Sequence, residues 1–278
     1  MLFFVFFLLL FLSFVNFCVI DCIVWWSVFI ICTFVFIFMA KGVSGFCLIN
    51  YYIIQEISGY YFLLFDGWML QFMVLLLKSG SSPFHFWLFS FLPGLNKWYF
   101  LWFLFLQKLP YFFVLVNFCG DFFFFILFFG MVVCYLQFFY LRDFGDMVVI
   151  GSTESFNWLL LLGMFSFNEV FIFFFFYYFT MMIVMSYTYM WSFNFFSIEM
   201  LMIFFNVPMS MTFFLKVFTL FDLSVGFYYY LLLLIMPLLS VGFGYFFFLI
   251  CMTSFNYGLK YYDYFIYLVF CLGFLSVF

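Results

Sequence analysis

Long apolar runs, separated by only a few polar residues, follow one another along almost the whole chain. Hydrophobic residues make up 72% of the 278 residues, and charged residues make up only 6%. A soluble domain has about a quarter of its residues charged. A helix that crosses the hydrocarbon core of a membrane takes roughly 20 apolar residues, which is the length of these runs. The sequence therefore predicts an all-α polytopic membrane protein.

The apolar runs fit eleven transmembrane helices with short connections. The expected spans are 2–20, 23–40, 45–65, 67–80 with a continuation toward residue 92, 98–118, 121–141, 145–165, 168–191, 196–220, 225–251 and 261–277. Short loops are expected where the helical bundle is the whole protein. We therefore expect one membrane domain over residues 1–278.

The charged residues near the span ends separate into two groups when eleven spans are counted. The even-numbered ends carry the basic residues Lys41, Lys97, Arg142 and Lys260. The odd-numbered ends carry Asp21, Asp66, Asp121, Glu169 and Asp222. Asp143, Asp146 and Asp263 also lie at even ends, but the orientation rule counts only Lys and Arg. The pattern supports the count and predicts an N-terminus on the matrix or cytoplasmic side, with the C-terminus opposite.

The composition excludes several kinds of cofactor site. His85 is the single histidine, whereas a di-haem cytochrome or a haem–copper oxidase needs several histidine ligands. The eight cysteines form no Cys-x-x-Cys pair, and we interpret them as small buried hydrophobic residues. No nucleotide-binding or hydrolase motif is present. The sequence therefore predicts no metal and no cofactor in this chain, and nothing indicates a nucleic-acid partner.

Three of the seven basic residues lie inside apolar segments. They are Lys78 in MVLLLKSGSSPFHFW, Lys108 in WFLFLQKLPYF and Lys216 in VPMSMTFFLKVFTLF. A charge at the centre of a bilayer costs at least about 2.5–3.5 kcal/mol. The alternative is that each lysine extends from a helix end to water, which fits Lys108 least. Because a buried amine can carry a proton, we predict a proton path through these three lysines.

Helix-breaking residues accompany all three lysines. Gly80 and Pro83 follow Lys78, Pro110 follows Lys108, and Pro208 precedes Lys216. Interrupted helices free backbone carbonyl groups for ions or water at the level of the membrane. Two such helices in the two halves of a chain indicate an inverted-repeat transporter fold. The half-repeats are expected at roughly 45–165 and 168–278.

Three further polar residues are candidates for the proton path. Glu56 lies about eleven residues into the span 45–65 and is the candidate carboxylate partner of a lysine. Glu154, in IGSTESFNW, lies nearer a helix end and is either a path residue or a polar lining residue. His85 is either a path residue, which we favour slightly, or a buried structural histidine. Since no residue here could drive protons against a membrane potential, we expect a subunit rather than a self-sufficient pump.

Two motifs identify a family. The segments KSGSSPFHFW at 78–87 and LQKLP at 106–110 resemble mitochondrially encoded subunit 2 of respiratory complex I, and the spacing from Pro208 to Lys216 also matches. The segments LRD at 141–143 and GSTESFNW at 151–158 match more loosely. The short length and the 62 Phe residues are most similar to roundworm versions. Abundant Phe with a single Ala also indicates the T- and G-rich coding strand of an organellar genome.

The resemblance implies an antiporter-like, proton-translocating subunit in the mitochondrial inner membrane. Its fold derives from a fourteen-helix ancestor by loss of three N-terminal helices, which leaves eleven. The implied partners are a neighbouring antiporter-like subunit, the small core membrane subunit, accessory subunits and phospholipids such as cardiolipin. NADH, FMN, Fe–S clusters and ubiquinone are expected in or on other subunits.

The sequence departs from the family pattern at the coupling carboxylate. The family's W-x-G-L-E aligns with WSVFI at 26–30, which places Ile30 where the family has Glu. Our hypothesis is that Glu56, one span later, supplies the missing carboxylate. Ser155 also replaces a family histidine. Two alternatives remain, a stand-alone cation/proton antiporter and a structural complex I subunit that has lost pumping.

Overall fold

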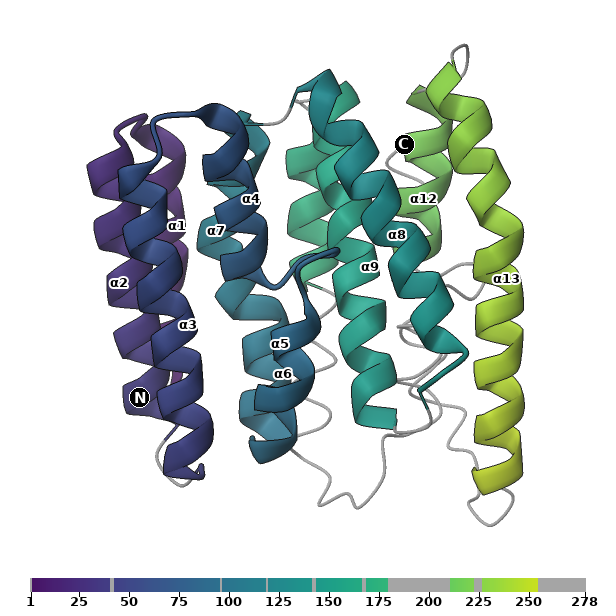
Figure 1. The fold of residues 1–278 in the computed structure, drawn as a ribbon, viewed down its shortest axis with the longest axis horizontal. Helices are drawn as coiled ribbons and strands as arrows, with labels where there is room; N and C mark the ends of the chain where they lie inside the picture. Colours follow the sequence, from purple (N-terminus) through teal and green to yellow (C-terminus); the bar gives the residue numbers. More distant parts are fainter. Residues whose placement is uncertain are drawn as a thin grey trace. The chain divides into compact units, whose positions relative to one another are not determined.

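The computed structural model describes residues 2–40, 43–95, 97–118, 120–141, 144–166, 169–179, 211–222 and 227–254. Helices occupy most of these ranges, as Figure 1 shows. The chain divides into two compact units, Met1–Gly130 and Met131–Phe278. This division does not test the half-repeats at 45–165 and 168–278, which stay a prediction.

Three helices open the first unit. They are α1 (Leu2–Cys18), α2 (Cys22–Met39) and α3 (Gly45–Leu64), and α2 packs against both of the others. α1 carries exposed Phe side chains at helical spacing, namely Phe4, Phe7, Phe11 and Phe14. A helix that is apolar on its exposed face as well as its buried face suits lipid rather than water.

The next span is interrupted close to Lys78. α4 (Trp68–Ser79) ends at Gly80, and α5 (Phe86–Phe91) continues into the short η1 (Leu92–Gly94) (Figure 1). Gly80 has φ +63°, a left-handed conformation that favours glycine. A Cβ atom there would also lie 2.9 Å from Cδ1 of Leu88, so both backbone and packing require glycine.

A second interruption lies close to Lys108. α6 (Lys97–Phe105) passes through the 3₁₀ turn η2 (Leu106–Lys108) into α7 (Leu109–Phe118). Pro110 is the second residue of α7, where a missing backbone N–H costs no intrahelical hydrogen bond. The turn therefore changes the helix geometry at the lysine without ending the span.

The second unit contains the two longest helices of the described part of the chain, together with shorter ones. α8 (Phe124–Phe138), which follows η3 (Asp121–Phe123), leads into it. α9 (Phe144–Phe165), a helix over Glu169–Phe179, α12 (Met211–Asp222) and α13 (Phe227–Ser254) follow in chain order. α12 packs against α9 and α13. Its contact with α9 positions the site described below.

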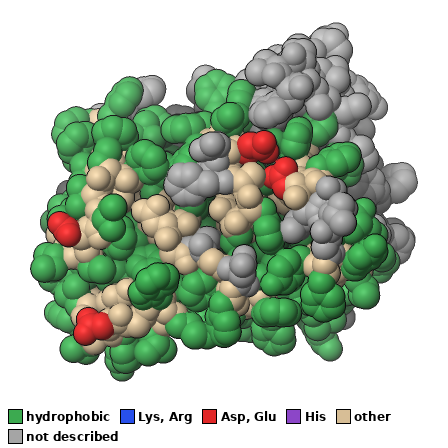
Figure 2. All heavy atoms as spheres, turned by 90° about the horizontal axis from the view of Figure 1, so that it is seen from above, with side chains coloured by type: hydrophobic (Ala, Val, Ile, Leu, Met, Phe, Trp, Pro, Cys, Tyr) green, Lys and Arg blue, Asp and Glu red, His purple; other side chains and the backbone are tan. Residues whose placement is uncertain are grey.

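Several helices have the length and composition of membrane spans. Cys22–Met39, Tyr99–Phe118 and Gly145–Phe165 are long and apolar enough to cross a membrane, and shorter apolar helices lie between them. On the face that Figure 2 shows, hydrophobic side chains predominate, with acidic side chains at a few places. The described residues therefore agree with an all-α membrane protein. The count of eleven stays a prediction, because span 261–277 and the residues Lys41, Arg142, Pro208 and Lys260 lie outside the described ranges.

Candidate functional site

The three lysines that lie in apolar segments of the sequence are all buried inside the protein. Lys78 is 2% exposed, Lys108 3% and Lys216 1%. A lysine that extended from a helix end to water would expose its amine. The described residues instead enclose these side chains, so their surroundings decide what their charges can do.

Lys216 forms an ion pair with Glu154. The Lys216 amine donates to Oε1 of Glu154, and neither side chain has appreciable exposure. Glu154 lies in the middle of α9, and Lys216 lies on α12, which packs against α9. The sequence-based expectation that Glu154 is near a helix end was wrong, because α9 extends ten residues before it and eleven residues after it.

Two neutral groups hold the same carboxylate oxygen. The Tyr135 hydroxyl donates to Oε1 of Glu154 at 2.5 Å. Trp158 donates from Nε1 to Oε1 of Glu154 at 3.1 Å and to the Tyr135 hydroxyl at 3.2 Å. The Lys216 amine also lies 5.8 Å from the centre of the Trp158 ring. Hydrogen bonds to a charged acceptor are stronger than those between neutral groups, so Tyr135 and Trp158 stabilise the ionised carboxylate.

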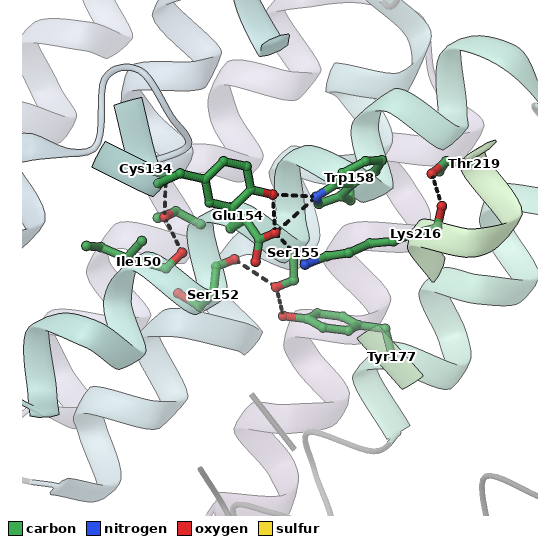
Figure 3. Close-up of polar contacts among 11 residues, drawn as sticks. Cys134, Ile150, Ser152, Glu154, Ser155, Trp158, Tyr177, Lys216 and Thr219 are labelled. Carbon is green, nitrogen blue, oxygen red and sulfur yellow. Dashed lines mark hydrogen bonds and ion pairs between the residues drawn. The ribbon is translucent and has the colours of Figure 1, made fainter. Parts of the chain in front are cut away.

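Further hydroxyl groups surround the ion pair, as Figure 3 shows. The hydroxyls of Ser155 and Tyr177 lie 2.7 Å apart, and Thr153 contacts the thiol of Cys134 at 3.6 Å. Ser155, which the sequence resemblance aligns with a family histidine, here joins α9 to the helix over Glu169–Phe179 through Tyr177. The ion pair therefore lies in a polar cluster between helices whose described residues are mostly apolar.

This cluster can hold and exchange a proton. An amine and a carboxylate in direct contact can share one proton, and the neutral donors limit the penalty for leaving a charge there. Buried ion pairs are often no more stabilising than well-packed apolar residues of similar size. Stability alone therefore does not account for the pair.

Lys78 has different surroundings. Its amine lies 5.3 Å from the centre of the Phe29 ring on α2. On α3 it lies against Gly59, where a Cβ atom would be only 3.2 Å from the Lys78 amine and 3.3 Å from Nε1 of Trp26. Cation–π attraction stabilises such a charge modestly. The absent side chain of Gly59 gives the amine its place against α3.

Protein groups bind the carbonyls at the end of α4. The carbonyl of Leu76 accepts from the backbone N–H of Ser81 at 3.0 Å, and that of Leu77 accepts from Nε1 of Trp87 at 3.0 Å. Nε2 of Gln55 donates to the carbonyl of Lys78 at 3.0 Å. The expectation that this break frees carbonyls for ions or water does not describe these three groups. The hydrogen bonds instead fix the end of α4 and with it the position of Lys78.

Glu56 lies on α3, one helical turn before Gly59. Its side chain is half-buried, and its carboxylate interacts electrostatically with the Lys78 amine. Ile30, which the sequence resemblance aligns with the family carboxylate, is half-buried on α2. The structure thus places Glu56 on the helix that Lys78 contacts. Its role as the replacement carboxylate stays a prediction.

The other predicted residues lie in both interruptions of the first unit. His85 is fully buried at the start of α5 and stacks on Phe86, with ring centres 5.0 Å apart, and meets Phe89 edge-on at 5.6 Å. Lys108 ends the 3₁₀ turn before Pro110. Pro83 follows Gly80 in the segment that connects α4 and α5. Pro208 lies outside the described residues.

Sequence reasoning missed the residues that hold the charged groups in place. Trp158 follows Glu154 by four residues, a spacing that places both on one helix face and could have revealed it. Tyr135 and Gln55 carry no such signal, because each of them binds a residue on a helix other than its own. Within the described part of the chain, no three His, Cys, Asp or Glu side chains gather to hold a metal ion.

Known proteins are similar to this sequence over most of its length. No protein-family model matches the chain. It is 42% identical over 211 residues to "NADH-ubiquinone oxidoreductase chain 2" of Ascaris suum, covering 76% of this chain and 70% of the relative. It is 37% identical over 216 residues to the protein of the same name of Caenorhabditis elegans, covering 77% of each. The resemblance noted in the sequence is thereby confirmed, and the chain belongs to the NADH-ubiquinone oxidoreductase chain 2 family.

Proposed function

We propose that the chain is a core membrane-arm subunit of mitochondrial complex I and takes part in proton translocation coupled to electron transfer from NADH to ubiquinone. Lys78, Lys108 and Lys216 carry the path, with His85 as a further member. Glu154 is the partner of Lys216, and Glu56 serves Lys78. The redox groups and ubiquinone belong to other subunits.

The buried ion pair of Glu154 and Lys216 carries this proposal. An ionisable residue within a membrane is a functional candidate by default, because its burial is expensive. Here both charges are enclosed, yet two neutral donors support the carboxylate when the amine loses its proton. Such a pair can alternate between a charged and a partly discharged state, as proton transfer requires.

We also propose how the chain is oriented in the membrane and what surrounds it. The N-terminus faces the matrix, and the C-terminus faces the intermembrane space. Apolar side chains exposed on α1 face phospholipids, such as cardiolipin, or accessory subunits. A neighbouring antiporter-like subunit and the small core membrane subunit flank the chain. The eleven-span, inverted-repeat fold that lacks three N-terminal helices belongs to the same proposal.

A native gel of gently solubilised membranes, stained for NADH dehydrogenase activity, is the first test. We expect mass spectrometry to find the chain in the active high-mass band. If the chain migrates as a small free species, the stand-alone antiporter becomes the better explanation.

Proton pumping by the purified complex in proteoliposomes is the second test. Replacing Lys216 by Met should lower the number of protons moved per electron, because the ion pair can no longer exchange a proton. An unchanged ratio would favour the structural subunit that has lost pumping.

A further inference from the structure

Two hydrogen-bonded pairs join α3 to the helical segment that contains Lys108. Gln107 donates from Nε2 to the Tyr51 hydroxyl at 3.3 Å, and one turn further along both helices Tyr111 donates to Oε1 of Gln55 at 3.3 Å. We refer to Tyr51, Gln55, Gln107 and Tyr111 as the Tyr–Gln ladder. Their side chains are between 0% and 3% exposed. The ladder is therefore a buried polar contact between two spans of the first unit.

Backbone carbonyls fix the orientation of both glutamine amides. Nε2 of Gln107 also donates to the carbonyl of Cys32 at 2.9 Å, and Nε2 of Gln55 donates to the carbonyl of Lys78 at 3.0 Å. A carbonyl oxygen only accepts hydrogen bonds, so a flipped amide would set two acceptors against each other. This orientation determines which hydrogen-bonding atoms of the ladder stay unused by the described residues.

The pair of Tyr51 and Gln107 leaves one acceptor and one donor unused. Among the described residues, Oε1 of Gln107 accepts no hydrogen bond. The Tyr51 hydroxyl accepts from Gln107, and no described residue accepts its own proton. Buried polar groups are almost always satisfied by protein or by ordered water. Here the unused donor and the unused acceptor belong to side chains already in contact, so a single water molecule can serve both.

We propose that one ordered water molecule binds between the Tyr51 hydroxyl and Oε1 of Gln107 and forms, with Tyr51, a section of the proton path between Lys78 and Lys108. The placement supports this role, which rests on the proposed function. Gln107 directly precedes Lys108, and Gln55, one turn after Tyr51, binds the carbonyl of Lys78.

The proton step is balanced. An arriving proton binds the oxygen of Tyr51 as the hydroxyl proton passes to the water, and the water releases one of its own protons to the next acceptor. One proton enters and one leaves, so the hydroxyl and the water regain their composition. Gln107 takes up no proton, because an amide is a poor base. It orients the water through its carbonyl oxygen.

A density map of the intact complex, at a resolution that shows ordered water, tests the binding site. We expect density within hydrogen-bond distance of both the Tyr51 hydroxyl and Oε1 of Gln107. A map that shows no such density, or that shows density within hydrogen-bond distance of only one of the two atoms, overturns the proposal. This result does not depend on whether the complex pumps through this chain.

Replacement of Tyr51 by Phe tests the relay. The ring keeps its stacking on Phe91, with centres 5.1 Å apart, and only the hydroxyl is lost. We expect the water density to disappear and the number of protons moved per electron to fall. Tyr52→Phe is the matched control, because Tyr52 is the next residue on α3 and is exposed, so its ratio should not change. An unchanged ratio in Tyr51→Phe overturns the relay.

Lys78→Met in the same assay separates this proposal from the proposed function. If Lys78→Met pumps normally, the function proposed for the lysines fails, whatever the map shows at Tyr51. If Lys78→Met lowers the ratio and Tyr51→Phe does not, the path runs through Lys78 but not through the Tyr–Gln ladder.

Discussion

Lys78 and Lys216 are both buried lysines next to a helix-breaking segment of the sequence, but the protein stabilises them differently. Lys216 is in direct contact with a carboxylate that two neutral groups also bind. Lys78 lies on an aromatic ring and against a glycine, and the half-buried Glu56 acts on it electrostatically. Lys216 has a fixed counter-charge, whereas Lys78 is held mainly through the shape of its site and the hydrogen bonds of its backbone.

The difference teaches where a substitution will matter. Removing one charge from a buried ion pair leaves the other without compensation, so stability and proton transfer both suffer. Removing a charge near Lys78 leaves the enclosing groups intact, so proton transfer should suffer more than stability. Four substitutions test this contrast, and each is measured as the heat-inactivation midpoint of the assembled complex and as protons moved per electron.

The largest effect is expected from Glu154→Gln. It leaves the Lys216 charge buried without its partner, which costs about 3–5 kcal/mol, and pumping should fall with stability. The double variant Glu154→Gln with Lys216→Met should recover stability but not pumping. Glu169→Gln is the matched control, since Glu169 is half-buried at the start of the next helix and should change little. Normal pumping by Glu154→Gln would remove the ion pair from the path.

Tyr135→Phe should have the second largest effect. It removes one hydrogen bond to the Glu154 carboxylate, which is worth about 1.5–3 kcal/mol because the acceptor is charged. We expect a lower inactivation midpoint and a lower pumping ratio, because the carboxylate is less well stabilised when Lys216 releases its proton. Tyr140→Phe is the control, since Tyr140 is exposed. Equal behaviour of the two variants would show that the hydroxyl does not support Glu154.

Gly59→Ala tests the site of Lys78 in the opposite way, by filling space. The new Cβ atom would lie 3.2 Å from the Lys78 amine, which can move because it is the end of a flexible side chain. Alanine is more favourable than glycine in a helix by about 1 kcal/mol, which offsets part of the cost of crowding. We expect a small change in stability and a clear loss of pumping. Gly45→Ala on the same helix meets nothing within 4 Å and should pump normally, and similar results for both would contradict the close fit at Gly59.

The sequence predicted what depends on local pattern and composition. Among the described residues, apolar runs located helices such as α2 and α3 to within a few residues, and the two lysine motifs identified the family. These features depend on residues that are near one another in the chain.

The contacts that distinguish the two lysines could not be predicted in this way. Lys216 and Glu154 are 62 residues apart, and Gln55 is 23 residues from Lys78. Which of several carboxylates meets which lysine depends on how the helices pack, and apolar faces of similar size specify that packing weakly. A single sequence therefore left the role of Glu154 open between a path residue and a lining residue.

The smallest effect on stability is expected from Glu56→Gln, and it tests the comparison most sharply. Glu56 is half-buried and has no direct ion pair among the described residues, so the free energy of unfolding should change by no more than about 0.5 kcal/mol. If Glu56 replaces the family carboxylate that is aligned with Ile30, the number of protons moved per electron should nevertheless fall. Asp66→Asn removes the same charge from an exposed position beyond the end of α3 and should leave the ratio unchanged. Equal ratios in both variants would mean that Lys78 works without a carboxylate partner, unlike Lys216.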